Sequence, residues 1–333
     1  MTRPTRRTVS QALLIQALLM AGASLATPWV HAQESFPSKP IKIIVPTSPG
    51  GNLDAVARVI AERLSPMFGQ PVIVENRVGA SSSIGTRFVG QSPPDGYTIL
   101  MMGNTFASTP AIMAGAGYDA VKDFVGVTLI ARLPELLVVP AASPYQTLGE
   151  LIAAAKAKPG QITYASAGSG SVARFASERM AHQLGLRLVH VPYKGNGEAL
   201  VDMVAGRVDL MFDQMSTSLP HVKSGRLRAL AITSAKRADV LPEVPTFADA
   251  GVKDFEDYTW IGFVAPAAVP RETVRRLHAA VLKVLQTPEI HARFTGQGLE
   301  VRGTESPEEF TAFIRSEVTR LTKLAQDANI KLE

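Results

Sequence analysis

The chain has 333 residues and no cysteine, which excludes disulfide frameworks, thiol nucleophiles and thiolate metal sites. Lys and Arg number 34 against 29 Asp and Glu, but three of the arginines lie in the first 32 residues, which hold no acid. The rest of the chain carries 31 basic and 29 acidic residues, and this near balance argues against nucleic acid as a partner. The remaining length of about 300 residues predicts two domains or one large one.

The first 32 residues are predicted to be a cleavable signal peptide. Three arginines precede an apolar stretch from Ala12 to Ala26, and Val30 and Ala32 supply the small residues that signal peptidase requires. The apolar stretch spans about 15 residues, fewer than the ~20 that cross a bilayer, which disfavours a membrane anchor. We expect cleavage after Ala32 and export to the periplasm, by either the general secretory or the twin-arginine route.

Short β-branched runs alternate with amphipathic segments along the exported part. The first strand is predicted at 41–46, followed by a helix at 53–64 with one apolar and one charged face. Asn52 is predicted to cap that helix. Further strands are expected at 71–75, 97–102, 125–131, 136–140, 162–165, 188–191, 210–212 and 227–233, and further helices after the turn 79–85 and at 148–157, 171–184 and 198–205. This alternation predicts an α/β fold with a mostly parallel sheet and helices on both faces.

The chain from Arg271 to Lys331 has a different pattern. It is predicted to be almost wholly helical, with breaks at Pro288, at 296–298 and at Pro307. A helical tail of this kind usually packs back on an earlier domain, and no low-complexity linker separates it from the rest of the chain. We therefore expect the tail to return to an earlier part of the fold.

Two strand–loop–helix junctions, 46–52 and 165–171, are rich in glycine and serine. Glycine lets the backbone turn sharply and brings its N–H groups close to a ligand. The helix after each loop adds unpaired N–H donors and a partial positive charge. In an open α/β sheet, ligands bind at this carboxyl-end edge. Either loop alone could be a simple tight turn, but two of one kind, facing each other from separate domains, predict a site that grips an anion from both sides.

Other polar residues are predicted at the same edge. Asn104 and Thr105 follow one predicted strand, and Asp213 follows another. Asp54 has two interpretations. It is either an acid in the first helical turn, stabilised by the helix dipole, or a cleft carboxylate that orients water or meets an amino group of the ligand. Asp213 has a similar pair of interpretations.

The second loop also fits a rival pattern. Gly168 to Ala173 matches the dinucleotide-binding pattern G-x-G-x-x-A, but the next strand ends without the acid that would bind a ribose. The serines lack the spacing of a nucleophile elbow, and the chain has no phosphate-binding G-x-x-x-x-G-K-S/T loop. The histidines are scattered and form no H-x-x-x-H pair, so a zinc site is not expected. The sequence therefore predicts no catalytic group, no cofactor and no metal.

Six segments, taken together and in order, carry a resemblance to a known family: PTSPGGNLDAVAR, VENRVGASSSIGTRFVGQSPPDGYTIL, YASAGSGS, HVPYKGNGEALVDMVAGRVDLMF, GRLRALAITSAKRADVLPEVPTFADAG and WIGFVAPAAVP. They resemble the Bug family of periplasmic receptors, the substrate-binding components of tripartite tricarboxylate transporters. The resemblance implies a two-domain α/β fold of the periplasmic-binding-protein type (Venus flytrap, type II), each domain being a mixed, mostly parallel sheet flanked by helices. Residues 34–133 and 257–333 would form one domain, and 134–256 the other.

The family holds a ligand carboxylate between two loops, largely through backbone N–H groups and bound water. Carried over to this sequence, the resemblance points to Gly50, Gly51, Asn52 and Asp54 in the first loop and to Ser166, Ala167, Gly168, Ser169 and Ser171 in the second. The chain departs from the family pattern at Thr47, where an aromatic residue is common, and at Ser48-Pro49, where alanines are common. Because these changes touch the pocket wall or its rim, the ligand of another family member does not identify the ligand of this chain.

The expected function is capture of a small mono- or dicarboxylate by a monomeric, non-enzymatic receptor that delivers it to membrane permease subunits. Side chains around Thr47, Asn104 and Asp213 would select the acid. Two alternatives remain open at this point: a sensor that presents its ligand to a membrane signalling partner, and a nucleotide-binding enzyme that uses the second loop.

Overall fold

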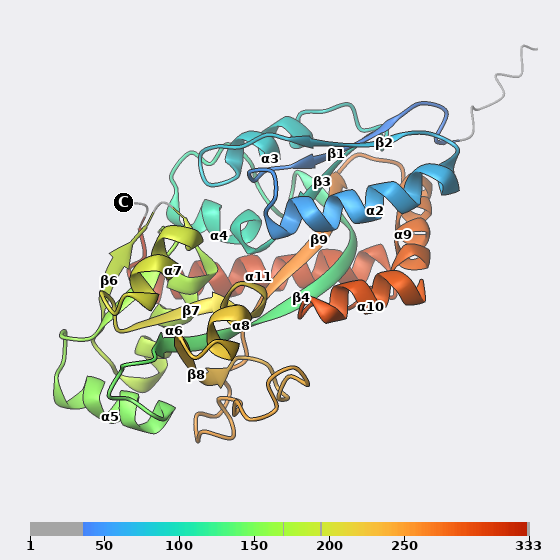
Figure 1. Ribbon diagram of the computed structural model, residues 1–333. Coiled ribbons are helices and arrows are strands. Elements are labelled where there is room, and N and C mark those ends of the chain that lie inside the picture. The colour runs from blue at the N-terminus through green and yellow to red at the C-terminus, as the bar shows by residue number, and fades with distance from the viewer. Residues whose placement is uncertain (1–35, 169, 194, 332–333) are drawn as a thin grey trace, which may run out of the picture. The chain divides into compact units, whose positions relative to one another are not determined.

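The computed structural model describes residues 36–331 except Ser169 and Lys194, so the predicted signal peptide lies outside the described residues. Figure 1 labels the elements. The strands are β1 (Ile41–Val45), β2 (Val72–Asn76), β3 (Thr98–Met102), β4 (Phe124–Pro140), β5 (Thr163–Ser166), β6 (Val189–Pro192), β7 (Leu210–Gln214), β8 (Leu227–Ile232), β9 (Tyr258–Pro266) and β10 (Glu300–Val301). The helices are α2 (Asn52–Phe68), α3 (Ser83–Gly90), α4 (Asn104–Ile112), α5 (Leu148–Ala157), α6 (Val172–Leu184), α7 (Asn196–Val204), α8 (Met215–Lys223), α9 (Arg271–Leu285), α10 (Pro288–Gly296) and α11 (Pro307–Asp327).

The strands form one mixed sheet within a compact unit that begins at Lys39. Their order is β2-β1-β3-β9-β4-β7-β5-β6, with β10 and β8 both paired to β4. We call β2, β1, β3, β9, β10 and the part of β4 before Glu135 the first half-sheet. The rest of β4 with β7, β5, β6 and β8 is the second half-sheet. In the first half-sheet, β1 is parallel to β2 and β3, and in the second, β5 is parallel to β6 and β7. Each of the two predicted glycine/serine loops therefore follows a strand that has parallel neighbours on both sides.

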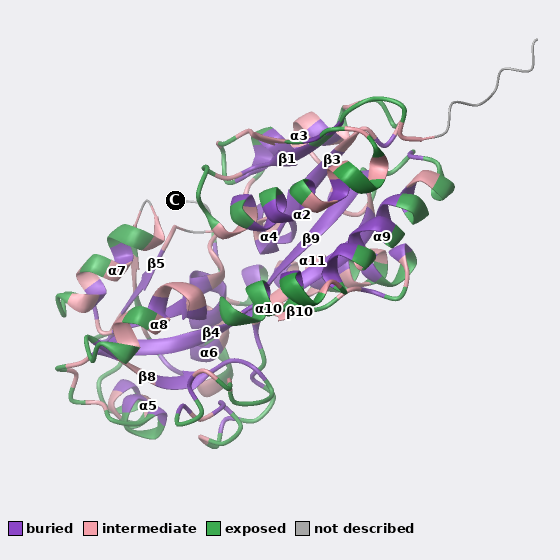
Figure 2. Ribbon diagram, turned by 45° about the vertical axis from the view of Figure 1, so that its right-hand side comes forward, coloured by how far each residue is buried: buried purple, intermediate pink, exposed green. Residues whose placement is uncertain are grey.

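β4 is a single strand of 17 residues that runs through both half-sheets. It pairs antiparallel with β9 up to Pro134, with β7 from Glu135 and with β8 from Leu136. The prediction of two separate strands in this region is therefore wrong. Pro134 has no N–H to donate, and it lies where β4 changes partners, a place where a strand tolerates proline. Figure 2 shows β4 and β9 buried along most of their length.

Several elements were not predicted from the sequence. β9 is buried almost throughout and therefore lacks the alternation that marks a half-exposed strand. α4 and α8 contain Pro110 and Pro220, residues that argue against a helix interior. In the C-terminal tail, the three helices and their breaks agree with the prediction, and only the two-residue strand β10 is additional.

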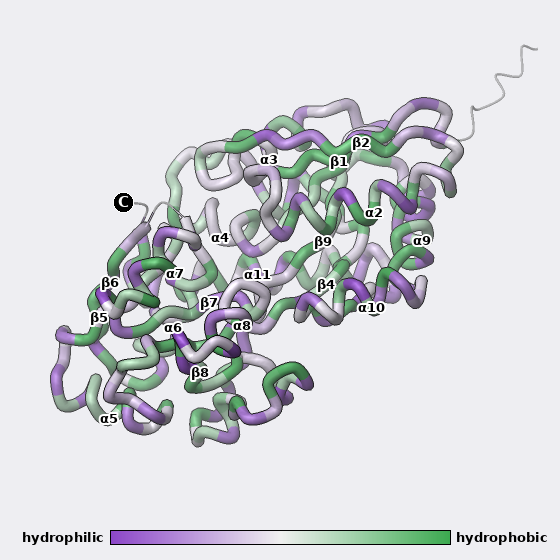
Figure 3. Tube along the Cα trace, in the orientation of Figure 1, coloured by the Kyte–Doolittle hydropathy of each residue, from purple (hydrophilic) through white to green (hydrophobic). Residues whose placement is uncertain are grey.

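α2 illustrates how the local sequence forms a helix. Val56, Ile60 and Leu64 are buried on one face, and Figure 3 shows hydrophobic and hydrophilic residues alternating along this helix. The N-cap is Gly51, so the prediction that Asn52 caps the helix is wrong. Asn52 is the first helical residue, which frees its side chain for contacts elsewhere.

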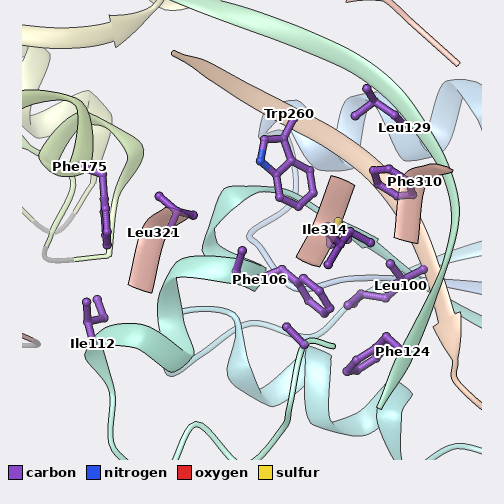
Figure 4. Packing of buried hydrophobic residues seen from close by; sticks show 14 of the residues in the cluster. Leu100, Phe106, Ile112, Phe124, Leu129, Phe175, Trp260, Phe310, Ile314 and Leu321 are labelled. Carbon is purple, nitrogen blue, oxygen red and sulfur yellow. The ribbon is translucent and has the colours of Figure 1, made fainter. Parts of the chain in front are cut away.

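The C-terminal helix α11 packs against the first half-sheet. Phe310 and Ile314 lie in a buried core with Leu100 of β3 and Trp260 of β9 (Figure 4). The indole Nε1 of Trp260 donates a hydrogen bond of 3.0 Å to Glu317 Oε2. This packing agrees with the expectation that the helical tail folds back on an earlier part of the chain.

Candidate functional site

A cavity of about 500 Å³ lies beside the loops that follow β1 and β5, and residues of both half-sheets line it. Many of the residues predicted for the site are on its wall: Gly50, Gly51, Asn52, Thr105, Ala167, Gly168, Ser171 and Asp213. The wall also contains residues that were not predicted from the sequence as contacts of a carboxylate: Ser81, Glu135, Gly170, Val172, Ala173, Asn196, Phe212, Gln214 and Thr217. The structure therefore brings the two predicted loops together around one space.

Asp54 braces the β1–α2 loop. Its buried carboxylate accepts hydrogen bonds from Arg58 Nε (3.0 Å), from the backbone N–H of Gly50 (2.9 Å) and from Asn76 Nδ2 (2.9 Å). The bond from Arg58, together with those from Gly50 and Asn76, lowers the pKa of Asp54 to about 2. The ionised Asp54 thus holds the loop in place, and it is not among the residues lining the cavity.

Thr47 and Ser48 precede the loop glycines and do not line the cavity. The carbonyl of Thr47 accepts a 3.0 Å hydrogen bond from Asn76 Nδ2, and Ser48 is exposed. Gly50 has a φ of +83°, a left-handed conformation that favours glycine. The residues of this loop that face the cavity are consequently the two glycines and Asn52.

The β5–α6 loop is held by two serines. Ser166 is fully buried, donates from Oγ to the carbonyl of Gly168 at 3.1 Å and lies 2.7 Å from His190 Nε2. Ser171 caps α6 by accepting from the N–H of Arg174, and its Oγ donates to the same Gly168 carbonyl at 2.7 Å. Gly168 adopts a φ of +95°, which favours glycine. Ser169 lies outside the described residues.

Asp213 is buried on the cavity wall at the end of β7. It accepts hydrogen bonds from Asn196 Nδ2, from Ser218 Oγ and from Thr217 Oγ1, the last at 2.8 Å. Burial raises the pKa of Asp213, and the three donors oppose that rise. Both oxygens of this carboxyl group already have partners on the protein.

Glu135 is the second acid on the cavity wall, and its side chain is only 1% exposed. Burial raises the pKa of Glu135 well above its ordinary value, and the charges of Asp257 and Asp213 raise it further. The sequence carried one signal for this residue: a single acid within the apolar run Leu133 to Pro140.

Asn104 and Thr105 begin α4 but have different surroundings. Asn104 is buried, donates from Nδ2 to the carbonyl of Tyr258 at 3.0 Å and accepts from the N–H of Trp260 at 2.8 Å. It fastens α4 to β9 and does not line the cavity, whereas Thr105 does. Thr105 Oγ1 also donates to Ser82 Oγ at 3.4 Å.

A model of the tripartite tricarboxylate transporter family receptor matches residues 56–330. The chain belongs to this family. The receptor is 40% identical over 311 residues to a protein of Pseudomonas sp. strain P51 encoded between tcbD and tcbE, with 92% of each chain covered. It is 33% identical over 327 residues to BugT of Bordetella pertussis, covering 98% of the receptor and 99% of BugT. The resemblance to Bug proteins is thus confirmed.

Solved structures agree with the family and with the fold. An R. palustris protein with adipate is 34% identical, with a TM-score of 0.79 and coverage of 89% of the receptor and 99% of that chain. MatC from Rhodopseudomonas palustris with bound malate is 30% identical, with a TM-score of 0.76 and coverage of 87% and 99%. The receptor therefore has the predicted α/β, two-domain fold of periplasmic binding proteins.

The described wall of the cavity offers hydrogen-bond donors and no basic side chain. Within the described residues, no group of three or more His, Asp or Glu could hold a metal ion. The first N–H groups of α2 and α6 have no partners within their own helices, and each helix carries a partial positive charge at that end. The arrangement suits non-covalent capture of an anion through backbone donors.

Proposed function

We propose that the receptor captures a small mono- or dicarboxylate in this cavity and delivers it to the membrane permease subunits of a tripartite transporter. The observation that carries the proposal is the placement of two glycine/serine loops, each leading into a helix N-terminus, on one cavity. Such termini favour anions. Two relatives solved with adipate and with malate support this ligand class.

The proposed contacts divide into two groups. Backbone N–H groups of both loops, other than that of Gly50, which donates to Asp54, would hold the carboxylate, and wall side chains would meet the rest of the ligand. Proposed ligand contacts are Gly50, Gly51, Asn52, Thr105, Ala167, Gly168, Ser169, Ser171 and Asp213. Asp54, Ser166 and Asn104 would position these contacts without touching the ligand, because each uses its side chain to fix a neighbouring segment. Thr47 and Ser48 would shape the rim.

The proposed domains are 34–133 with 257–333, and 134–256. Support comes from β4, which changes partners between Pro134 and Glu135, and from β9, which begins at Tyr258. A ligand that contacts both domains favours their closed arrangement, so capture requires differential binding and no chemical step.

The receptor would act in the periplasm as a monomer after cleavage of the signal peptide at Ala32. Its family is a receptor family, and none of the helices in residues 36–331 is long and apolar enough to cross a membrane. A transport receptor delivers its ligand to a permease, whereas a sensor does not. Comparing ligand uptake by cells with and without the receptor therefore separates the transport role from the sensor role.

Thermal-shift titration of the mature protein tests the proposal. Malate, adipate and matched monocarboxylates form one panel, their amides a second, and ATP and NAD a third. We expect at least one carboxylate to raise the melting temperature increasingly with concentration, while its amide does not, because binding to the folded state alone stabilises it. Stabilisation by a nucleotide and by no carboxylate would overturn the receptor function.

A further inference from the structure

Glu135 lies on the cavity wall at the point where β4 leaves β9 and joins β7. Its backbone is fixed: its N–H donates to Thr233 Oγ1 at 2.8 Å, and its carbonyl accepts from the N–H of Thr233 at 2.9 Å. Glu135 is 1% exposed, yet its Oε2 has no hydrogen-bond partner among the described residues, and neither does the neighbouring buried hydroxyl of Thr259. Buried polar groups nearly always have enough partners, so an under-satisfied carboxyl group on a residue that lines a ligand cavity points to a partner on the ligand.

Two other buried acids lie close enough to act on Glu135, and both are compensated. Asp213, on β7, accepts hydrogen bonds from three side chains. Asp257, just before β9, has Arg179 at 3.7 Å and Arg320 at 3.5 Å. Among the described residues, Glu135 forms no ion pair with a Lys, Arg or His side chain. An ionised Glu135 would therefore add uncompensated negative charge where an anion is to bind.

The surroundings of Glu135 favour its neutral form. Burial raises its pKa well above the ordinary value, and the neighbouring charges of Asp257 and then Asp213 raise it further, while the hydroxyl of Thr259 lowers it. A protonated carboxyl group has an O–H to donate, whereas an ionised one can only accept. The neutral acid thus supplies a donor to a cavity wall that has no basic side chain among its described residues.

We infer that Glu135 keeps its proton in the receptor and donates a hydrogen bond to an oxygen of the bound acid, so that only the protonated receptor binds the acid tightly. This inference rests on the proposed function, since it requires a carboxylate ligand. The two loops hold one carboxylate, and Glu135 recognises an oxygen acceptor elsewhere on the ligand. The receptor consequently selects acids with a second oxygen group over acids with an ammonium group at that end, which would need the ionised form.

Titration calorimetry with malate, adipate and their amino-substituted counterparts, between about pH 6 and about pH 9, tests the inference. For the wild type, affinity for a non-amino acid should fall as the pH rises, by up to about tenfold per pH unit once Glu135 loses its proton. Glu135→Gln keeps a donor at every pH. It should bind as tightly as the wild type near about pH 6 and show no fall toward about pH 9. Glu62→Gln, the same change at an exposed position of α2, should behave as the wild type.

Three results would overturn the inference while leaving the receptor function intact. They are a wild-type affinity that rises with pH, a Glu135→Gln variant that shows the same fall in affinity as the wild type, and tightest binding of an amino acid that Glu135→Gln abolishes. If the wild type binds no carboxylate, the proposed receptor function is itself contradicted. Infrared spectra give a second readout: at neutral pH the wild type should contain the carbonyl band of a protonated carboxyl group that the Glu135→Gln variant lacks, and this band should shift when the acid binds. Absence of the band would overturn the inference.

Discussion

Asn52, the first residue of α2, donates a hydrogen bond from Nδ2 to Oε1 of Gln214 at the end of β7, across 162 positions of sequence. The same Nδ2 lies 3.3 Å from Ser216 Oγ. A second contact, from Ser108 Oγ to the carbonyl of Gly170 at 3.2 Å, also connects the two half-sheets beside the cavity. These contacts and a ligand that bridges the two loops would stabilise the same closed arrangement, so their stabilising effects would add.

Asn52→Ala should weaken ligand binding by about tenfold, since it removes hydrogen bonds worth about 0.5–1.5 kcal/mol each. The helix itself should persist because alanine is a strong helix former. Calorimetry measures the affinity, and small-angle X-ray scattering should show a more open unliganded protein. Ser216→Ala, which removes only the longer contact, is the matched control and should have a smaller effect. Unchanged affinity and scattering for Asn52→Ala would contradict a role for this contact in closure.

Gly168→Val should weaken binding by at least about tenfold, because a β-branched residue at a φ of +95° costs about 1–3 kcal/mol and distorts the loop. The fold should survive, since an added Cβ would meet only the carbonyl of Tyr193, at 3.7 Å. Gly160→Val is the control. Gly160 has a φ of +73°, and no atom lies within 4 Å of an added Cβ. It should lose similar stability and keep its affinity. Equal affinities for the two variants would count against the β5–α6 loop as a contact.

Asp54→Asn should loosen the β1–α2 loop and lower both affinity and stability at neutral pH. The pKa of Asp54 is lowered to about 2 in the folded protein, from an ordinary value of 3.8. The stabilisation it contributes is therefore fully present above about pH 4 and is lost as the pH falls toward about 2. Urea unfolding at several pH values should show the wild type and variant converging over that range. A constant difference down to about pH 2 would mean that the Asp54 charge does not stabilise the loop.

Gly262→Ala should destabilise the first half-sheet by about 1–3 kcal/mol. An added Cβ would lie 2.2 Å from Cζ of Phe310 and 2.9 Å from the carbonyl of Thr128, so α11 must shift away from β9. Gly296→Ala in α10 is the control. Nothing lies within 4 Å of that Cβ, and the change should be neutral or stabilising by up to about 1 kcal/mol. Denaturant unfolding measures both, and equal stabilities would contradict the close packing of α11.

The parts of the site that depend on local backbone could be predicted from the sequence. Gly50 and Gly168 were proposed because glycine in a strand–loop–helix junction permits left-handed turns, and both have positive φ values and line the cavity. The alternation of strands and helices could be predicted from the spacing of apolar residues, a pattern that spans only a few positions. These features need no knowledge of which segments lie side by side.

The parts that depend on distant contacts could not be predicted. Gln214 reaches the cavity because β7 lies beside β4, and Glu135 does so because β4 changes partners there. Asp54 was proposed as a site residue from its place in the first turn of a predicted helix and from the family resemblance, and Asn104 from its position after a predicted strand. Their side chains bond to Arg58 and to the backbone of β9 and do not line the cavity, which no spacing in the sequence discloses.

Mass spectrometry of compounds released from the natively purified protein is the most direct test of carboxylate capture by the receptor. The receptor function predicts a single small organic acid, close to one per protein molecule, that is absent from the Gly168→Val variant purified in the same way. Release of a nucleotide, or of a stoichiometric compound without a carboxyl group, would contradict it.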